Sequence, residues 1–352
     1  MRVLVTGGAG FVGSHVVEQL LDVGAEVRVL DLLDADLHPG GAVDLDPRAE
    51  LIVGDIRDRP LVRRALAGVD AVCHQAAKVG LGIDFGDAGS YVAHNDAGTA
   101  VLLDALWQRR FRGRLVLASS MVVYGEGRAR CPEHGAVAPG QRRPAELAAG
   151  RFEPPCPVNG CDHSTSWMPV SEDDRVDPRN VYAATKLHQE HLCQAWGRES
   201  GATVIALRYH NVYGPRMPRD TPYAGVASIF RSAVAAGVAP QVFEDGGQTR
   251  DFIHVGDVAR ANVLAITGPD VESGAYNIAS GTPHTIADMA RCLAPALTPQ
   301  ITGAWRVGDV RHIVASGRKA ADRLGFAAEV GFAEGMAEFA RAPLRAARMP
   351  TN

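Results

Sequence analysis

The sequence contains no apolar run that approaches the ~20 consecutive residues needed to span a bilayer. It also has no dense basic run, and its 36 Lys and Arg residues nearly balance its 40 Asp and Glu residues, giving a formal net charge of −4. We therefore expect no nucleic-acid partner and no membrane partner. Residues 2–6 already read as a strand, with no basic segment before them, so we expect a cytoplasmic protein. No internal repeat is visible, and 352 residues suffice for one compound unit or two domains.

A glycine-rich turn near the start gives the sharpest signal. Residues 2–6 are followed by Gly7, Gly10 and Gly13, and then by a helical pattern of apolar residues. Such glycines permit a tight turn, close approach of backbone N–H groups to a pyrophosphate, and close packing of the helix on the strand. Asp31 ends the next strand, where a carboxylate can accept hydrogen bonds from ribose hydroxyls and repels a 2′-phosphate. The pattern predicts a dinucleotide site that favours NAD over NADP.

Short apolar strands and helical patterns continue to alternate, with strands predicted at residues 51–53, 71–73, 115–120 and 203–207. This alternation predicts an α/β fold with a doubly wound parallel Rossmann sheet. Asp55 is compatible with an adenine contact or with a loop cap, and His74 reads as structural. We also expect Asn95 to open a helix. The predicted cofactor-binding residues of this part are Gly7, Gly10, Phe11, Val12, Gly13, Asp31, Asp55, Ile56, Gln75, Ala76, Ala77 and Asn95.

A tyrosine and a lysine are spaced to share one helix face. Tyr182 and Lys186 stand at positions i and i+4, and a phenol beside an ammonium loses its proton more readily. Tyr182 could therefore act as a general base toward a hydroxyl. Ser119 and Ser120 end a predicted strand, where ligands of doubly wound sheets lie, and Ser120 could share the moving proton. The alternatives are a surface tyrosine stacked on a lysine stem and a serine that satisfies its own turn.

An unusually long segment, rich in Pro, Gly and Cys, separates Tyr124 from Tyr182 and spans about 57 residues. It holds three of the six cysteines, a clustering that a cytosolic chain uses more often for metal than for disulfides. Cys156 and Cys161 are spaced more widely than in the usual zinc knuckle, so a loop with free thiols stays open. The candidate ligands of a structural zinc ion are Cys131, Cys156, Cys161 and one of His134 or His163.

Three motifs occur in one order: the glycine-rich turn, Ser119-Ser120 followed by Val123-Tyr124-Gly125, and Tyr182-x-x-x-Lys186. Together they resemble the extended short-chain dehydrogenase/reductases, and most of all the nucleotide-sugar epimerases and dehydratases. The resemblance covers residues 1–125 and 176–330. It implies an NAD cofactor, a nucleotide-diphosphate sugar as substrate, and a homodimer. The long insertion also resembles that of dTDP-L-rhamnose 4-epimerases, although Asn159 and Gly160 stand here where that branch has its second cysteine.

The resemblance also implies roles for individual residues. Ser120, Tyr182 and Lys186 would be catalytic, and Tyr182, Lys186 and Tyr209 would also contact the cofactor. Arg250 and Arg306 would hold the diphosphate, Asp309 the nucleoside ribose, and Asn211 a phosphate or a sugar hydroxyl. The implied substrate-binding residues are Lys78, Ser120, Met121, Asn211, Arg250, Arg306 and Asp309.

The residues after Ser120 bear on the choice between chemistries. The related 4,6-dehydratases carry an Asp-Glu pair there, whereas this chain has Met121 and Val122, which have no titratable proton. We therefore expect an epimerase that inverts C4 of a nucleotide-diphosphate hexose through a transient 4-keto sugar. The alternatives are a 4-ketoreductase or dehydrogenase, a 4,6-dehydratase, and a non-catalytic NAD-sensing protein.

The expected domain organisation follows from these motifs. Residues 1–125 and 176–215 would form the NAD-binding Rossmann domain, and residues 126–175 the Cys-rich insertion. Residues 216–352 would mainly form a smaller C-terminal substrate-binding lobe, with 251–270 returning to the Rossmann domain.

Overall fold

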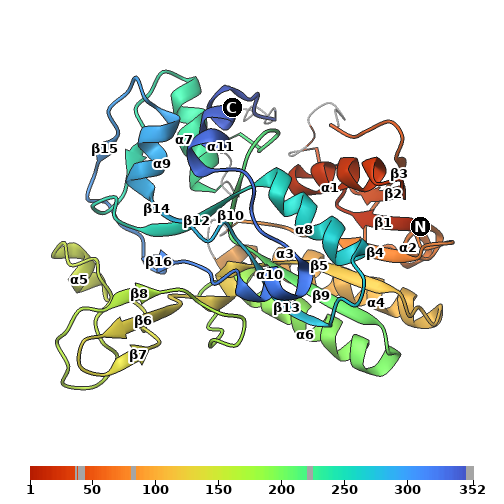
Figure 1. Ribbon diagram of the computed structural model, residues 1–352, viewed down its shortest axis with the longest axis horizontal. Coiled ribbons are helices and arrows are strands. Elements are labelled where there is room, and N and C mark those ends of the chain that lie inside the picture. Colours follow the sequence, from red (N-terminus) through yellow and green to blue (C-terminus); the bar gives the residue numbers. More distant parts are fainter. Residues whose placement is uncertain (36–37, 39–43, 81–84, 220–224, 346–352) are drawn as a thin grey trace.

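The computed structural model describes residues 1–35, 38, 44–80, 85–219 and 225–345 (Figure 1). A seven-stranded parallel sheet forms its centre, with strand order β13-β9-β5-β4-β1-β2-β3. The predicted doubly wound Rossmann sheet is thereby confirmed, because the chain winds outward in both directions from β1. The strands are β1 (Arg2–Thr6), β2 (Glu26–Asp31), β3 (Glu50–Val53), β4 (Ala71–His74), β5 (Arg114–Ser120), β9 (Thr203–Tyr209) and β13 (Gly274–Ile278).

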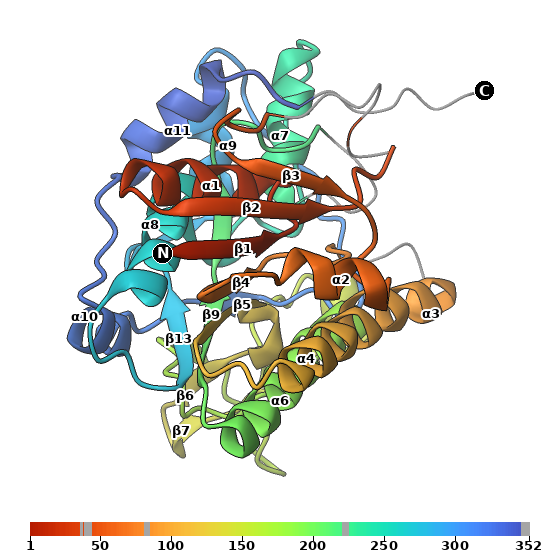
Figure 2. The same ribbon diagram turned by 90° about the vertical axis from the view of Figure 1, so that its right-hand side faces the viewer.

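Helices cover both faces of this sheet, as Figure 2 shows. One face is packed by α1 (Phe11–Asp22) and α8 (Val255–Thr267), whose apolar sides share a core with Val3, Val5 and Val29. The other face is packed by α2 (Arg59–Ala65), α4 (Gly98–Gln108) and α6 (Val181–Ser200). The strands read as continuous apolar runs because both faces are covered.

The helix that contains Asn95 begins earlier in the chain than expected. Asn95 does not open it: α3 (Ala88–Tyr91) runs through a π-helical segment, Val92–Ala97, directly into α4. The Asn95 amide is fully buried and bonds the backbone of Lys78 at 2.7 and 3.0 Å and the hydroxyl of Thr185 at 3.0 Å. A tertiary role for this amide therefore replaces the helix-capping role that its residue type suggested.

The C-terminal residues build a second, smaller layer of structure. Strands β10 (Asn211–Tyr213), β12 (Thr249–His254), β14 (Pro283–Thr285) and β16 (His312–Ile313) form one sheet, and β11 (Gln241–Val242) pairs with β15 (Gln300–Ile301). Around them lie α7 (Val226–Ala235), α9 (Ile286–Leu293) and α11 (Phe332–Arg341), whose core includes Phe230, Met289 and Phe339. Helix α10 (Arg318–Leu324) returns to pack near β13 and α8.

The Cys-rich insertion forms its own small sheet, seen at the lower left of Figure 1. Strands β7 (Gly135–Val137), β6 (Arg128–Cys131) and β8 (Ser166–Met168) pair antiparallel, and the short helix α5 (Pro144–Ala148) follows β7. A bridge between Val170 and Ala315 ties its end to the C-terminal layer. Among the described residues, no helix combines the length and the apolar character that crossing a membrane requires.

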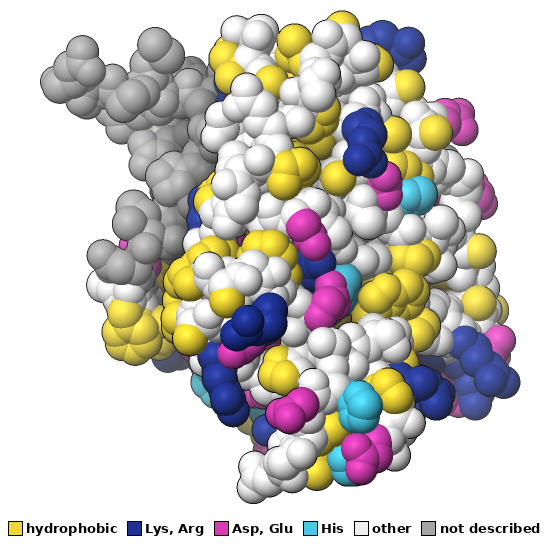
Figure 3. All heavy atoms as spheres, turned by 90° about the vertical axis from the view of Figure 1, so that its left-hand side faces the viewer, with side chains coloured by type: hydrophobic (Ala, Val, Ile, Leu, Met, Phe, Trp, Pro, Cys, Tyr) yellow, Lys and Arg dark blue, Asp and Glu magenta, His cyan; other side chains and the backbone are white. Residues whose placement is uncertain are grey.

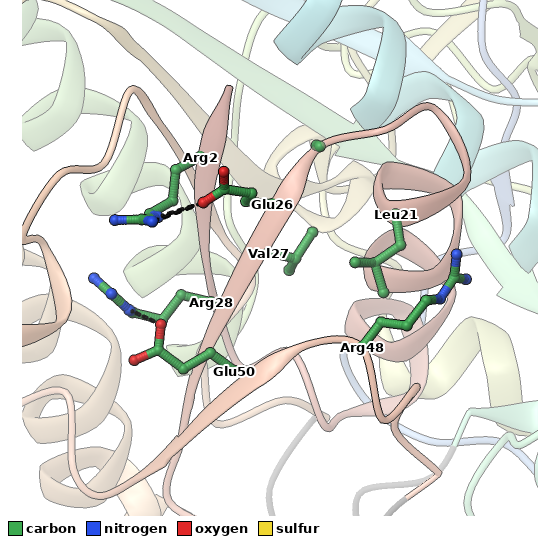
Figure 4. Close-up of a pocket in the computed structure, with 8 residues that line it drawn as sticks. Arg2, Leu21, Glu26, Val27, Arg28, Arg48 and Glu50 are labelled. Carbon is green, nitrogen blue, oxygen red and sulfur yellow. Dashed lines mark hydrogen bonds and ion pairs between the residues drawn. The ribbon is translucent and has the colours of Figure 1, made fainter.

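A hollow of about 280 Å³ lies at the edge where β1, β2 and β3 begin (Figure 4). Its charged side chains are paired with one another or with close neighbours: Arg2 with Glu26, Arg28 with Glu50, and Arg48 with Asp22 and Asp46. The hollow is thus at the opposite end of the strands from Ser120, and its described lining residues present no unpaired charge to a ligand.

Two imidazoles are buried within the fold. His74 bonds Thr6 at 2.7 Å and Thr99 at 2.9 Å, and because Thr99 donates to the Asn95 carbonyl, the His74 Nε2 carries the proton. Neither ring nitrogen of His210 has a hydrogen-bond partner among the described residues. Burial lowers the pKa of both His74 and His210 to about 3, so both rings are neutral in the fold.

Substitution of His210 by Phe tests this acid sensitivity. The folded pKa lies below the unfolded value of about 6.5, so unfolding takes up a proton between about pH 6.5 and pH 3, and stability is lost as the pH falls through this window. As the pH falls from about 7.5 to about 5, each buried imidazole therefore lowers the free energy of unfolding by about 2 kcal/mol. We expect urea unfolding of His210→Phe to show a smaller loss over this range than the wild type. An equal loss in both proteins would contradict the buried, neutral state of His210.

Candidate functional site

The glycine-rich turn packs backbone directly against backbone. Gly7 has φ +68°, and a Cβ there would lie 2.7 Å from the backbone nitrogen of Ala76. A Cβ at Gly13 would lie 2.2 Å from the carbonyl oxygen of Gly7, so both positions require glycine. Gly10 caps α1 without a side-chain hydrogen bond, which leaves the first N–H groups of the helix for an anionic ligand. This turn has the shape and the donors that a pyrophosphate needs.

Asp31 is fixed beside this turn. Its Oδ2 accepts a hydrogen bond from the backbone N–H of Ala9 at 2.9 Å, and its Oδ1 accepts one from Leu33 at 2.9 Å. The carboxylate therefore stands at the carboxyl end of β2, next to the turn that follows β1. This is the relation that binding of a dinucleotide ribose requires.

The other predicted cofactor residues follow the ends of β3 and β4. Asp55 is paired with Arg57 at 2.5 Å, as a loop cap would be. The Gln75 amide bonds the Tyr209 hydroxyl at 3.0 Å and Asn262 at 2.9 Å, which joins the ends of β4 and β9. The structure thus gathers these residues at one edge of the sheet, although Asn95 is committed to the backbone of Lys78.

Ser120, Tyr182 and Lys186 come together at the same edge. Ser120 ends β5, and Tyr182 lies in the first turn of α6, close enough to the Ser120 hydroxyl for that hydroxyl to affect the pKa of the phenol. Asn180 caps α6 by accepting a hydrogen bond from Ala183 at 2.8 Å. The Lys186 Nζ lies 5.9 Å from the centre of the Tyr182 ring and donates to the Ala118 carbonyl at 2.9 Å.

The pKa values of this group differ from the sequence-based expectation. Burial raises the pKa of the Tyr182 phenol, and the nearby Ser120 hydroxyl offsets only part of that increase. Burial lowers the pKa of Lys186 to about 8, against the opposing effect of Cys193, Asp96 and Glu190. The expected lowering of the Tyr182 pKa by Lys186 is not seen, because the amine is directed to a backbone carbonyl.

A buried network behind these residues was missed in the sequence. Glu190 is 1% exposed; it accepts a hydrogen bond from Ser119 and two from Arg208, at 2.8 and 3.0 Å. Arg208 also bonds the Tyr124 hydroxyl at 2.8 Å. Ser119 is thereby committed to the fold, which leaves Ser120 as the serine that faces Tyr182. The one signal for this network in the sequence was the spacing of four residues between Lys186 and Glu190, which places Glu190 on the same helix face as Lys186.

The residues expected to bind substrate lie on several elements. Lys78 bonds Ser90 at 3.0 Å and lies over the Tyr91 ring. Met121 borders a small apolar cluster, and the Asn211 Oδ1 is buried with no hydrogen-bond partner among the described residues. Arg306 lies over the ring of Phe243, with 5.0 Å between guanidinium and ring centre.

Arg250 and Asp309 meet in the C-terminal layer. The buried guanidinium of Arg250 donates to the carbonyls of Val310 at 2.5 Å and Arg311 at 3.0 Å, so it holds the segment that carries Asp309. Burial raises the pKa of Asp309, and the nearby charges of Arg250, Arg306 and Arg142 oppose this shift. Both residues therefore belong to one charged cluster. Binding of a diphosphate by Arg250 stays a prediction.

In the insertion, four potential ligand atoms converge. The thiols of Cys131 and Cys156 each lie 3.6 Å from the Nδ1 of His134, and the thiols of Cys131 and Cys161 are 3.8 Å apart. All four ligand atoms, including those of Cys161, lie within 4.8 Å of one another. His163, the alternative ligand, instead lies 3.6 Å from Glu133. Burial favours the neutral thiol of Cys131, but hydrogen bonds from His134 and Glu133 lower its pKa to about 6.

Comparison with known proteins gives consistent matches over almost the whole chain. The model of the NAD dependent epimerase/dehydratase family matches residues 3–146 and 161–279. A dTDP-L-rhamnose 4-epimerase of Burkholderia thailandensis is 33% identical over 347 residues, covering 96% of this chain and 93% of the relative. A dTDP-glucose 4,6-dehydratase of Streptomyces niveus is 32% identical over 359 residues, covering 96% and 91%.

The structural comparison agrees. The crystal structure of a Thermus thermophilus UDP-glucose 4-epimerase in complex with NAD superimposes with a TM-score of 0.76 at 32% identity, covering 97% of this chain and 98% of that one. The resemblance inferred from the motifs is confirmed, and this chain belongs to the NAD-dependent epimerase/dehydratase family.

Proposed function

We propose that this protein is an NAD-dependent 4-epimerase, an isomerase that inverts C4 of a nucleotide-diphosphate hexose. The observation that carries the proposal is the placement of Ser120, Tyr182 and Lys186 at the sheet edge that also holds the glycine-rich turn. The similarity of this chain to relatives named as 4-epimerases supports the same activity. We propose that the sugar is linked to dTDP or UDP, the two nucleotides in the names of those relatives.

The glycine-rich turn and Asp31 would hold the pyrophosphate and the adenosine ribose of NAD. Gln75 and Tyr209, at the ends of β4 and β9, would line the path toward the nicotinamide. The negative charge of the Asp31 carboxylate would repel the 2′-phosphate of NADP, so NAD is favoured over NADP. When bound, NAD⁺ supplies the redox chemistry: it accepts hydride from C4 of the sugar and later returns it.

The chain itself manages the proton. Tyr182, in its ionised form, removes the proton of the 4-hydroxyl while the C4–H bond breaks, and a 4-keto sugar results. Ser120 bonds the same oxygen and keeps it in reach of the phenol. The ketose then presents its opposite face, the C4–H bond re-forms there, and Tyr182 returns the proton. For Lys186 to favour the ionised phenol during this exchange, its amine would have to turn from the Ala118 carbonyl toward the phenol.

Two residues argue against the elimination chemistry of related dehydratases. Met121 and Val122 follow Ser120 directly, and neither can move the protons at C5 and C6 that loss of water requires. Relatives named as 4,6-dehydratases also match this chain at 30–32% identity, so the proposal rests on these local residues rather than on overall identity. A 4-ketoreductase or dehydrogenase uses the same catalytic residues and is distinguished by its need for added cofactor.

The remaining assignments belong to the same proposal. Residues 216–352 would mainly form the substrate-binding lobe, with 251–270 returning to the Rossmann domain. In this lobe Arg250 and Arg306 would hold the diphosphate and Asp309 would contact the nucleoside ribose. Lys78, Met121 and Asn211 border the sugar. A cytoplasmic homodimer that pairs through α4 and α6 is the arrangement we propose, and Trp107 on α4 is 48% exposed.

Substitution of Tyr182 by Phe tests the mechanism. We expect wild-type protein to interconvert a C4-epimeric pair of dTDP- or UDP-hexoses without added cofactor, and Tyr182→Phe to lose at least about a hundredfold in kcat, because general acid–base catalysis contributes ~10²–10⁴. Product ratios are measured by NMR or anion-exchange chromatography. Tyr276→Phe serves as the control, since its hydroxyl bonds only the Glu272 carbonyl at 2.8 Å. Turnover that requires stoichiometric NADH would indicate a ketoreductase instead.

We further propose that Cys131, His134, Cys156 and Cys161 bind a structural zinc ion. Zn–S bonds of about 2.3 Å and Zn–N bonds of about 2.0–2.1 Å place tetrahedral ligand atoms about 3.5–3.8 Å apart. Three of the six pairwise separations, at 3.6, 3.6 and 3.8 Å, fall in or close to this range, and all four ligand atoms lie within 4.8 Å of one another. The insertion buries little apolar surface of its own, so a metal would supply much of its stability.

Metal analysis tests the zinc site. We expect about one zinc ion per chain in protein purified without chelators, and its loss, together with a lower melting temperature, in Cys156→Ser. Cys292→Ser is the matched control, because Cys292 is a half-buried free thiol in α9, outside the cluster. Metal-free wild-type protein with an unchanged melting temperature after zinc addition would rule the site out.

A further inference from the structure

The insertion reaches the C-terminal layer through a cluster of charged side chains. Figure 1 shows the insertion beside β16, and Figure 3 shows acidic and basic side chains mixed on this side of the molecule. The cluster joins side chains of both signs from residues far apart in the sequence; Arg142, Glu126, Glu244 and Arg311 are buried, whereas Glu153 and Asp245 are exposed. The members are Glu126, Arg142 and Glu153 from the insertion, and Glu244, Asp245, Arg250, Asp309, Arg311 and His312 from the C-terminal layer.

Arg142 stands at the centre of this cluster. Its side chain is 3% exposed, and its Nη1 donates to Glu244 Oε1 at 2.8 Å. Its Nη2 donates to the backbone carbonyl of Asp309 at 2.6 Å. Its Nε lies 3.6 Å from Glu126 Oε1. One planar guanidinium therefore joins three chain segments in a fixed geometry.

The segments that Arg142 joins are tightly constrained. Glu244 has φ +53°, a left-handed conformation uncommon for a residue with a side chain, and its carboxylate is shared between Arg142 and Arg311. Arg311 in turn bonds Glu153 of the insertion at 2.7 Å, and Glu153 bonds His312 at 2.8 Å. The segment from Arg306 to His312 is thus held from one side by Arg250 and from the other by the insertion.

We propose that Arg142 is a positioning residue for the nucleotide-diphosphate part of the substrate site. The inference rests on the proposed function, in which Arg306 and Asp309 contact that part of the substrate. Arg142 touches neither substrate nor cofactor in this proposal; it acts through the carbonyl of Asp309 and the carboxylate of Glu244. In this proposal the Cys-rich insertion helps to position the substrate-binding residues of the C-terminal layer.

Charge and geometry give Arg142 two separable effects. Its removal leaves the buried carboxylates of Glu126 and Glu244 with less positive charge around them, and this negative excess disfavours a diphosphate nearby. It also releases the Asp309 carbonyl, so the Arg306–Asp309 turn loses one of its fixed points. Lysine at this position restores the charge, but it cannot reproduce the planar bridge.

The test compares Arg142→Ala, Arg142→Lys and the control Arg143→Ala. Arg143 is the adjacent residue of the same type, is exposed, and makes no side-chain cap to α5. We expect Arg142→Ala to raise KM for the sugar nucleotide, and the Kd for UDP or dTDP by calorimetry, at least about tenfold, with kcat within about threefold and unchanged NAD content. We expect Arg142→Lys to fall between Arg142→Ala and wild type, and Arg143→Ala to match the wild type.

The outcomes separate this inference from the proposed function. An unchanged KM and Kd in folded Arg142→Ala, or a loss of kcat at constant KM, overturns the positioning role. If Arg142→Ala does not fold, Arg142→Lys decides the matter, since wild-type values in that variant also overturn it. If the wild-type protein epimerises no sugar tested, the proposed function fails, while the nucleotide titration still measures whether Arg142 supports a nucleoside-diphosphate site.

Discussion

The pairing of Glu190 with Arg208 is the interaction on which the catalytic geometry depends. A carboxylate that is almost fully buried must be neutralised, and removing one partner of such a pair typically costs ~3–5 kcal/mol. Glu190 lies on α6, Arg208 on β9 and Ser119 on β5, so their contacts fix one helix against two strands. Tyr182 lies on the same helix and Ser120 follows Ser119. The placement of the Tyr182 phenol relative to the Ser120 hydroxyl is therefore set by a charge pair that the proposed mechanism does not use.

Much of the Rossmann part could be predicted from the sequence because its signals are local. Strand ends at Thr6 and Ser120, the glycine turn and the acid at Asp31 all follow from apolar runs and residue types within a few positions of one another. Asn95 shows the limit of this reasoning: its residue type suggests a helix cap, but burial against Lys78 and Thr185 decides its role. The sequence pointed to Ser120 as the catalytic serine, but it did not show what holds Ser119, since Glu190 lies 71 residues further along.

The C-terminal layer and the insertion were predicted less well, again for a physical reason. Arg250 sits in a motif that indicates a phosphate contact, yet its hydrogen bonds go to backbone carbonyls, which leave no trace in residue type. The partners of Arg142 lie 102 and 167 residues away, and nothing in the local sequence distinguishes it from the adjacent, exposed Arg143. By contrast, three cysteines and a histidine in one segment were enough to anticipate their cluster, because those residue types are uncommon.

The division of the charged cluster between two parts of the chain constrains how this protein can diverge from its relatives. Three of its members are carried by the insertion and the others by the C-terminal layer. A chimera that received the insertion without Glu244 would leave the buried guanidinium of Arg142 without its closest carboxylate, and the recipient would be destabilised. Gain or loss of the insertion in a lineage must therefore be accompanied by exchange of its acidic and basic counterparts. Their joint inheritance would be visible as correlated substitutions at these positions.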